Sequence, residues 1–208
     1  MTYLLLPSPL LGPTSWARVA ELLDARVADP RGATTSADVL AAYVAAAEGL
    51  SDVVLVPHSN AGLYAPLLGA RIGADAVVYV DAALAGDGPD TGLAPEGFLS
   101  FLRGLADAEG LLPPWSQWWD DPVVDLVPAD GPRLPLTYFT SRIEVPPGWA
   151  DRPSGYLAFG DTYAEEIAFA RTHGWPLAAL PGRHLHQLVA PADVAAAVSD
   201  LAARAAAP

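Results

Sequence analysis

One serine stands where a buried strand is expected to turn directly into a helix. Val53 to Val56 are all apolar, as residues of a central strand in a parallel sheet must be. Ser59 follows three residues later and precedes a segment of helical periodicity over about residues 60–71. A serine on such a sharp turn projects its hydroxyl above the carboxyl ends of the strands. Ser59 is therefore the candidate nucleophile, and the alternative is an ordinary serine N-cap.

The residues around Ser59 suit that turn, with one exception. Ala61 and Gly62 are small, as the close passage of strand and helix backbones requires. Asn60 would place its main-chain N–H at the start of the helix, where it can stabilise a developing oxyanion. Pro57 is the exception, because proline cannot donate a hydrogen bond within the ladder of a central strand.

A candidate general base lies near the carboxyl terminus. His184 belongs to a loop that follows an expected strand and ends at Pro191, which opens the last helix. An imidazole with a pKa near 6.5 can take the serine proton at neutral pH. His186 fits the position less well, while His58 and His173 are interpreted as a packing residue and a polar loop residue.

The run Pro57-His58-Ser59-Asn60-Ala61-Gly62 resembles the G-H-S-x-G-G nucleophile elbow of the α/β-hydrolase superfamily, with Pro57 and Ala61 in place of two glycines. The resemblance extends over nearly the whole chain outside residues 82–153. It implies a small serine esterase or related hydrolase in which His184 occupies the usual place of the catalytic histidine. The joint occurrence of Ser59 and His184, in that order, favours the catalytic interpretation.

The acid that should orient the histidine is left open among three possibilities. In the superfamily this acid usually follows the strand that precedes the histidine strand. Asp161 stands at that place and is the first choice. Asp81, at the end of the strand after the nucleophile helix, is a second placement that the fold allows. A Ser-His dyad is the third. Glu165 and Glu166 are interpreted as first-turn acids of a helix, favoured by its dipole.

The loop after the first strand is similar to the superfamily's H-G-x-x-x oxyanion loop, but Pro7 and Ser8 replace its His-Gly pair. Pro9 has no N–H, so Leu10 is expected to supply the second oxyanion donor beside Asn60.

Three tryptophans stand close together in the middle of the chain. Trp115, Trp118 and Trp119 have helical spacing and would share one face. They either line an apolar pocket for an acyl, aryl or polyketide-like ligand or form a small core of their own segment. Phe98, Phe101 and Leu102 could line the same pocket.

Short apolar runs alternate with segments of helical periodicity, which predicts an α/β fold. We expect a mostly parallel sheet of about six strands flanked by helices, with residues 1–208 forming a single α/β-hydrolase-like domain. The expected strands cover residues 3–7, about 27, 53–56, 76–80, 156–159 and 176–180. The alternation breaks over about 82–153, which predicts a lid inserted above the sheet.

Composition restricts the classes of partner. The chain has 208 residues, a net charge of −13, no lysine and no cysteine. The acidic surface argues against nucleic acids and anionic membranes, and the lack of cysteine excludes disulfides and thiolate chemistry. No apolar run approaches the roughly 20 residues that span a bilayer, and the first residues read as a strand rather than a signal peptide. A cytoplasmic location is expected, and a homodimer is left open.

The expected reaction is acyl transfer to water from an ester, thioester or lactone of a hydrophobic small molecule. Ser59 would attack the carbonyl, His184 would move the proton, and no cofactor or metal is needed. One rival is a non-hydrolytic cyclase, dehydratase, epimerase or lyase of natural-product metabolism on the same scaffold. Another is a binding protein that has lost its chemistry.

Overall fold

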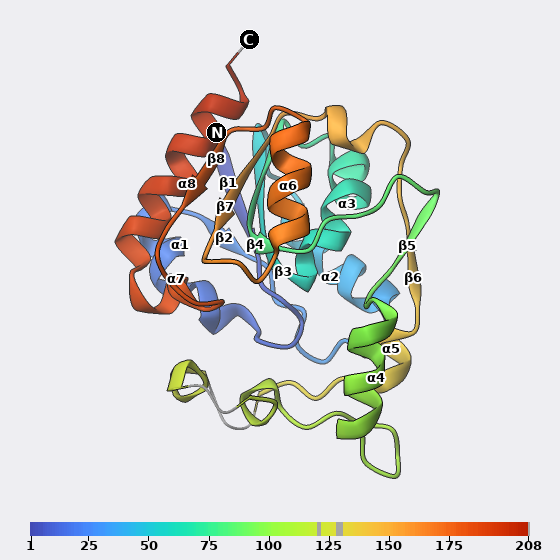
Figure 1. Cartoon of the computed structure of the whole chain (residues 1–208). Coiled ribbons are helices and arrows are strands. Elements are labelled where there is room, and N and C mark those ends of the chain that lie inside the picture. Colours follow the sequence, from blue (N-terminus) through green and yellow to red (C-terminus); the bar gives the residue numbers. More distant parts are fainter. Residues whose placement is uncertain (120–121, 128–130, 208) are drawn as a thin grey trace.

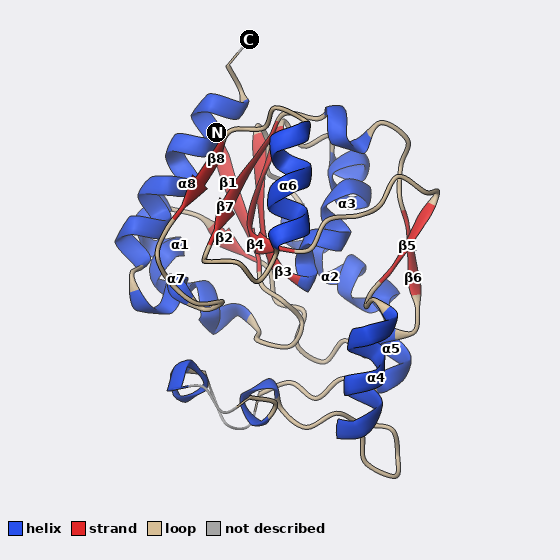
Figure 2. Ribbon diagram, in the orientation of Figure 1, coloured by secondary structure: helices blue, strands red, loops and turns tan. Residues whose placement is uncertain are grey.

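A computed structural model describes residues 1–119, 122–127 and 131–207. Its central feature is a six-stranded sheet in the order β2-β1-β3-β4-β7-β8, in which all neighbouring strands run parallel (Figures 1 and 2). The strands are β1 (Thr2–Leu6), β2 (Arg26–Val27), β3 (Val53–Ser59), β4 (Ala76–Ala82), β7 (Ser154–Ala158) and β8 (Leu177–Ala179). The α/β class and the parallel sheet predicted from the sequence are confirmed.

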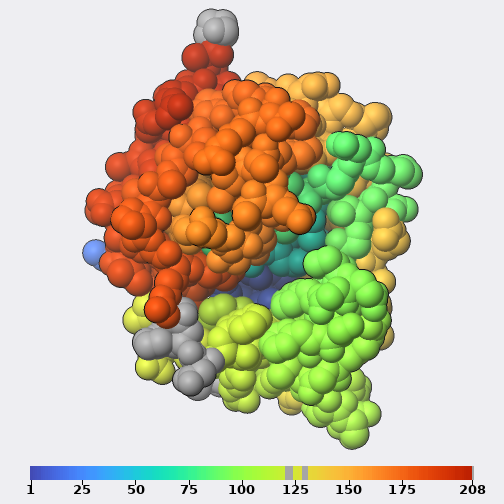
Figure 3. Space-filling model, in the orientation of Figure 1, coloured from blue at the N-terminus to red at the C-terminus, as the bar shows by residue number. Residues whose placement is uncertain are grey.

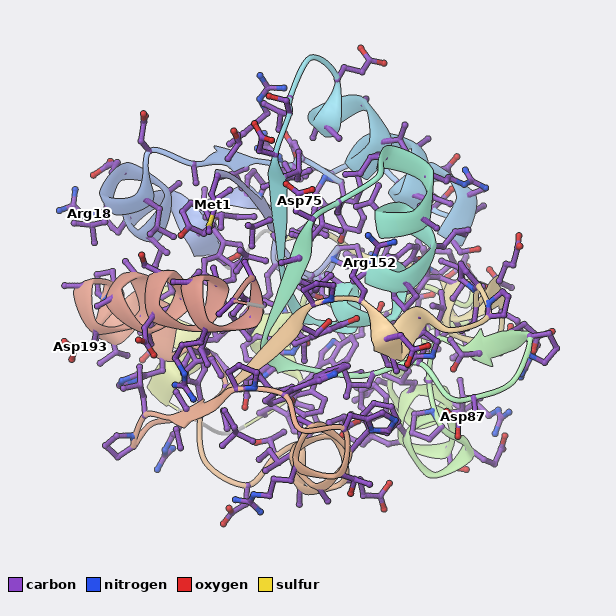
Figure 4. The ribbon with its side chains drawn as sticks, turned by 90° about the horizontal axis from the view of Figure 1, so that it is seen from above. Met1, Arg18, Asp75, Asp87, Arg152 and Asp193 are labelled. Atoms are coloured by element: carbon purple, nitrogen blue, oxygen red, sulfur yellow. The ribbon has the colours of Figure 1, made fainter. Side chains whose placement is uncertain are left out.

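Helices cover both faces of the sheet, as its buried strands require. They are α1 (Ala17–Leu23), α2 (Ser36–Ala47), α3 (Ala65–Ile72), α6 (Ala164–Thr172), α7 (His186–Val189) and α8 (Pro191–Ala205). Side chains alternate between two hydrophobic clusters: Val54 and Val56 pack with α1 and α8, whereas Leu55 packs with α2, α3 and α6. Seen from above, Arg18 of α1 and Asp193 of α8 lie on one side of the strands, opposite α3 (Figure 4).

The N-cap of α2 is Thr35. The Thr35 hydroxyl accepts a hydrogen bond from Asp38 N, and the Asp38 carboxylate accepts one from Thr35 N, at 3.1 and 3.0 Å. This reciprocal pair satisfies two N–H groups that the helix leaves without partners.

The helix after the nucleophile turn has two parts. Residues Asn60–Tyr64 form a 3-10 helix, and α3 begins only at Ala65. Pro66 stands in the first turn of α3, where its missing N–H costs no helical hydrogen bond. The 3-10 helix therefore gives way to the α-helix at the place where a proline removes a main-chain hydrogen-bond donor.

The stretch between β4 and β7, residues 83–153, lies partly beside the carboxyl ends of the strands and returns at its end to the start of β7 (Figure 1). It contains the antiparallel pair β5 (Asp90–Gly92) and β6 (Arg142–Glu144), helices α4 (Glu96–Leu105) and α5 (Leu136–Phe139), and 3-10 helices at Trp115–Gln117, Pro122–Leu126 and Trp149–Asp151. Positions 120, 121 and 128–130 of the expected insertion lie outside the described residues. We call this stretch the inserted segment.

A hydrogen bond and a packing contact hold the end of the inserted segment against α3 and the residues before β4. Arg152 donates to the carbonyl of Ala74 and lies against Gly69 of α3, and Figure 4 shows it between α3 and the strands. Within the described residues, no helix is long and apolar enough to cross a membrane.

Candidate active site

Ser59 occupies the strained turn that the sequence predicts. It ends β3 with φ 59° and ψ −131°, a conformation that a non-glycine residue adopts only when its surroundings impose it, at about 1–3 kcal/mol. The Ser59 carbonyl accepts a hydrogen bond from Ala83 N at 3.1 Å, and the β3–β4 register shifts between His58 and Ser59. Gly62 must also lack a side chain, because a Cβ at this position would collide with the Ala83 carbonyl oxygen.

Three side chains from distant parts of the chain form a continuous hydrogen-bonded relay. His184 Nε2 lies 2.9 Å from Ser59 Oγ, and His184 Nδ1 lies 2.8 Å from a carboxylate oxygen of Asp81. Asp81 is fully buried and its other oxygen accepts from Phe159 N at 2.9 Å. A carboxylate held in this way orients the imidazole and fixes the proton on Nδ1, so that Nε2 is free to accept from serine.

The carboxyl partner of the histidine is therefore Asp81, the second placement, and not Asp161, the first choice. Asp161 is exposed on the loop after β7 and lines the rim of the cavity in front of Ser59. Asp81 reaches the histidine because its backbone, with φ 42°, turns at the end of β4, directly beside the nucleophile strand. Glu165 and Glu166 lie in the first turn of α6, as expected.

His58 supports the loop that carries the base. Its ring stacks on the His184 ring at 4.6 Å between centroids, and its Nε2 lies 2.8 Å from the His184 carbonyl oxygen. Burial, and secondarily the neighbouring His184 charge, lowers the pKa of His58 well below its usual value. The neutral ring can therefore donate from Nε2 to that carbonyl. His58 thus packs at the turn, as expected.

The two expected oxyanion donors have different surroundings. The Asn60 N–H is the first of its 3-10 helix, and the first N–H groups of a helix have no partner within it. The Asn60 side chain is held by Tyr138, which donates to its oxygen at 2.6 Å, while its own amide donates to Leu93 O at 2.8 Å. Leu10 lines the cavity, but its N–H faces Ser8 Oγ at 3.4 Å, a long hydrogen bond that an oxyanion could replace.

A cavity of about 1610 Å³ opens in front of Ser59 and His184. Figure 3 shows the hollow from one side, between α6 in orange and α4 in green. Its apolar wall includes Leu63, Phe98, Trp115, Trp118, Trp119 and Phe139.

Trp115, Trp118 and Trp119 all line this cavity. Trp115 and Trp118 are nevertheless buried in the main hydrophobic cluster, so they combine both roles that the sequence left open. Trp119 is 42% exposed and stacks on Phe101 at 5.0 Å. Of the other expected lining residues, Phe98 lines the cavity, whereas Leu102 is fully buried in the core.

Tyr163 is the residue at this site whose role sequence reasoning missed. Its hydroxyl lies 3.4 Å from Ser59 Oγ, and its ring lies 5.7 Å from that of His184. It stands in the loop where the resemblance would place the acid, and it could not be assigned because a phenol cannot replace a carboxylate. The sequence signal for this position was the spacing of Tyr163 from Gly160, which matches the usual distance between that glycine and the acid.

Among the described residues, no group of three potential ligands could hold a metal ion.

No protein-family model matches the sequence, and no curated protein matches it. Solved structures do match over almost the whole chain. An extracellular α/β-hydrolase from a Paenibacillus species, described as sharing homology with tobacco salicylic acid binding protein 2, has a TM-score of 0.73 at 15% identity and covers 99% of this chain and 98% of its own.

Two further structures agree. The pyrethroid hydrolase PytH gives a TM-score of 0.70 at 18% identity, covering 100% of this chain and 99% of its own. Polyneuridine aldehyde esterase gives 0.71 at 13% identity, covering 97% and 99%. With the sheet order and the turn at Ser59, these likenesses establish that the chain has the α/β-hydrolase fold.

Proposed function

We propose that this protein is a serine hydrolase that cleaves an ester, thioester or lactone of an apolar small molecule through an acyl-serine intermediate. The observation that carries the proposal is the relay Asp81–His184–Ser59, with 2.8 and 2.9 Å between successive partners. It supplies a nucleophile, a base and an orienting carboxylate, which together suffice for acyl transfer without a cofactor.

In the acylation step, Ser59 Oγ attacks the substrate carbonyl while His184 Nε2 takes the proton of the Ser59 hydroxyl. The main-chain N–H of Asn60, and that of Leu10 once it leaves Ser8, would hold the carbonyl oxygen as its charge develops. The His184 proton then passes to the leaving oxygen or sulfur. Water repeats the sequence on the acyl-serine and releases the acid.

The substrate class follows from the wall of the cavity. Aromatic side chains of the inserted segment face the relay, and Trp115 lies 6.3 Å from the His184 ring between centroids. Four carboxyl side chains, Glu96, Asp161, Glu165 and Glu166, line the cavity beside the guanidinium groups of Arg142 and Arg183. This excess of negative charge favours an uncharged or cationic substrate over an anionic one. The inserted segment would then act as a lid that selects the substrate.

The test is hydrolysis of short p-nitrophenyl esters by the wild type and by Ser59→Ala. We expect turnover by the wild type and a loss of at least about a thousandfold in kcat in the variant, with an unchanged unfolding temperature. A variant as active as the wild type would refute the proposal. Asp161→Asn is the matched control, because its carboxylate lines the same cavity outside the relay.

A non-hydrolytic reaction at the same base is the second candidate, and the loop after β1 favours it. Pro9 lacks an N–H and the Leu10 N–H is directed at Ser8 Oγ, so one of the two expected oxyanion donors is engaged elsewhere in this structure. Proton abstraction by His184 would not depend on that site. This reaction predicts His184-dependent exchange of a ligand proton with solvent deuterium that survives in Ser59→Ala.

A further inference from the structure

Tyr163 has a hydroxyl beside Ser59 Oγ that the relay does not use. It follows β7 and forms the N-cap of α6, and its oxygen lies 3.4 Å from Ser59 Oγ. Burial raises the pKa of Tyr163 well above its usual value. The phenol therefore keeps its proton at neutral pH and can act only as a neutral hydrogen-bond partner.

The direction of that hydrogen bond follows from the relay. The Asp81 carboxylate only accepts, so His184 Nδ1 carries the imidazole proton and Nε2 is an acceptor. Ser59 must then donate its single proton to Nε2. The remaining contact on Ser59 Oγ can be made only if Tyr163 donates to it.

Tyr163 also lies on the opposite side of Ser59 from the oxyanion loop. In the sheet order β2-β1-β3-β4-β7-β8, β1 carries the loop of Leu10 and β7 carries Tyr163, with the nucleophile strand β3 between them. The strand order therefore places the loops of Tyr163 and Leu10 on opposite sides of the nucleophile strand. The partner of the phenol during the reaction is Oγ itself.

We propose that Tyr163 is a further catalytic residue, whose phenol assists Ser59 Oγ as the leaving group when the acyl-serine is hydrolysed. The proposal rests on the acyl-serine mechanism proposed above. Water adds to the acyl carbonyl and gives its proton to His184 Nε2. The C–Oγ bond then breaks, its electron pair returns to Oγ, and the Nε2 proton follows. Tyr163 keeps its own proton and donates only a hydrogen bond.

This geometry predicts a selective effect on one half of the reaction. In the free enzyme Tyr163 already donates to Oγ, and this hydrogen bond persists in the transition state of the attack on the substrate. Its removal therefore affects both states alike and leaves kcat/KM nearly unchanged. In the acyl-enzyme, Oγ is an ester oxygen and a weak acceptor. Charge returns to it as the C–Oγ bond breaks, and the bond from Tyr163 strengthens at that moment. Hydrogen bonds to a charged partner support an effect of about tenfold to a hundredfold on deacylation.

The experiment is stopped-flow hydrolysis of p-nitrophenyl butyrate by Tyr163→Phe, which retains the ring and removes only the hydroxyl. We expect kcat and KM to fall together by about tenfold to a hundredfold, with kcat/KM within about threefold of the wild type. A burst of p-nitrophenol and a butyryl adduct on Ser59, seen by mass spectrometry, should accompany the fall. Tyr79→Phe is the matched control, since Tyr79 is a buried phenol that packs on Trp175 and Trp149 away from the relay.

The two proposals fail in different ways. If the wild type never forms an adduct on Ser59, the hydrolase mechanism is wrong and the role of Tyr163 falls with it. If the wild type turns over through the adduct but Tyr163→Phe leaves kcat unchanged, or lowers kcat and kcat/KM equally, only the role of Tyr163 is overturned. An equal loss in both parameters would mark a structural contribution.

Discussion

The carboxyl edge of the sheet and the inserted segment meet at one cavity, but they are built differently. Ser59 and Asp81 end neighbouring strands with strained backbones that the sheet holds in place. The inserted segment instead presents aromatic side chains from short helices and loops. The sheet edge can therefore hold the reacting groups in place, while the inserted segment can vary the shape and polarity of the cavity. Substitutions in the two regions should have different kinetic signatures.

The largest effect is expected at the sheet edge, for Asp81→Asn. An amide in place of the carboxylate would accept poorly from Nδ1 and favour the wrong tautomer of His184, so we expect kcat to fall by about 10³–10⁴ with little change in KM. Steady-state kinetics on p-nitrophenyl esters measures this. Asp161→Asn should stay within about threefold of the wild type, and the reverse pattern would return the acid role to Asp161.

Gly62→Ala should break the same edge through packing rather than chemistry. The added methyl would meet the Ala83 carbonyl oxygen and approach the Ala82 side chain. Such overpacking costs about 1–3 kcal/mol, which lowers the unfolding temperature by several degrees for a chain of this length. Calorimetry measures the shift. Gly97→Ala is the control, because a Cβ on that glycine meets no atom within 4 Å; equal unfolding temperatures for the two variants would contradict the close approach.

His58 should make the stability of the sheet edge depend on pH. Because burial lowers the pKa of His58 in the folded state, the unfolded chain binds more protons below about pH 6.5, and stability falls as the pH falls. His58→Gln should remove up to about 1.4 kcal/mol per pH unit from that slope. Urea unfolding at pH 7.5, 6.5 and 5.5 measures it. His58→Gln would retain the wild-type slope if the ring were protonated in the folded state.

The smallest effect is expected in the inserted segment, for Trp119→Ala. Trp119 lines the cavity with a partly exposed ring, so its loss should raise KM for apolar esters by about three- to tenfold, while kcat and stability change little. A series of p-nitrophenyl esters of increasing chain length tests this, since the effect should grow with length. A fall in kcat of the size seen for Asp81→Asn would show that the two regions are not separable.

Sequence reasoning succeeded where a local pattern and the sheet topology agree. The apolar run before Ser59, the small Gly62 and the loop of His184 each have a local signature, and parallel strands bring their carboxyl ends to one edge. Asp81 lies at the end of β4 and Asp161 in the loop after β7, so both stand near that edge and spacing alone could not choose between them. The choice depends on strand adjacency and on the turn at Asp81, which are tertiary properties. The role of Tyr163 likewise depends on a tertiary contact, that of its hydroxyl with Ser59 Oγ.

The central claim is that Ser59 is a nucleophile activated by His184. It is tested most directly by treating the protein with a fluorophosphonate and mapping the adduct by peptide mass spectrometry. We predict one phosphonyl group, on Ser59, with a labelling rate that falls by about a thousandfold or more in His184→Ala. An unlabelled Ser59, or labelling at the same rate without His184, would contradict the account.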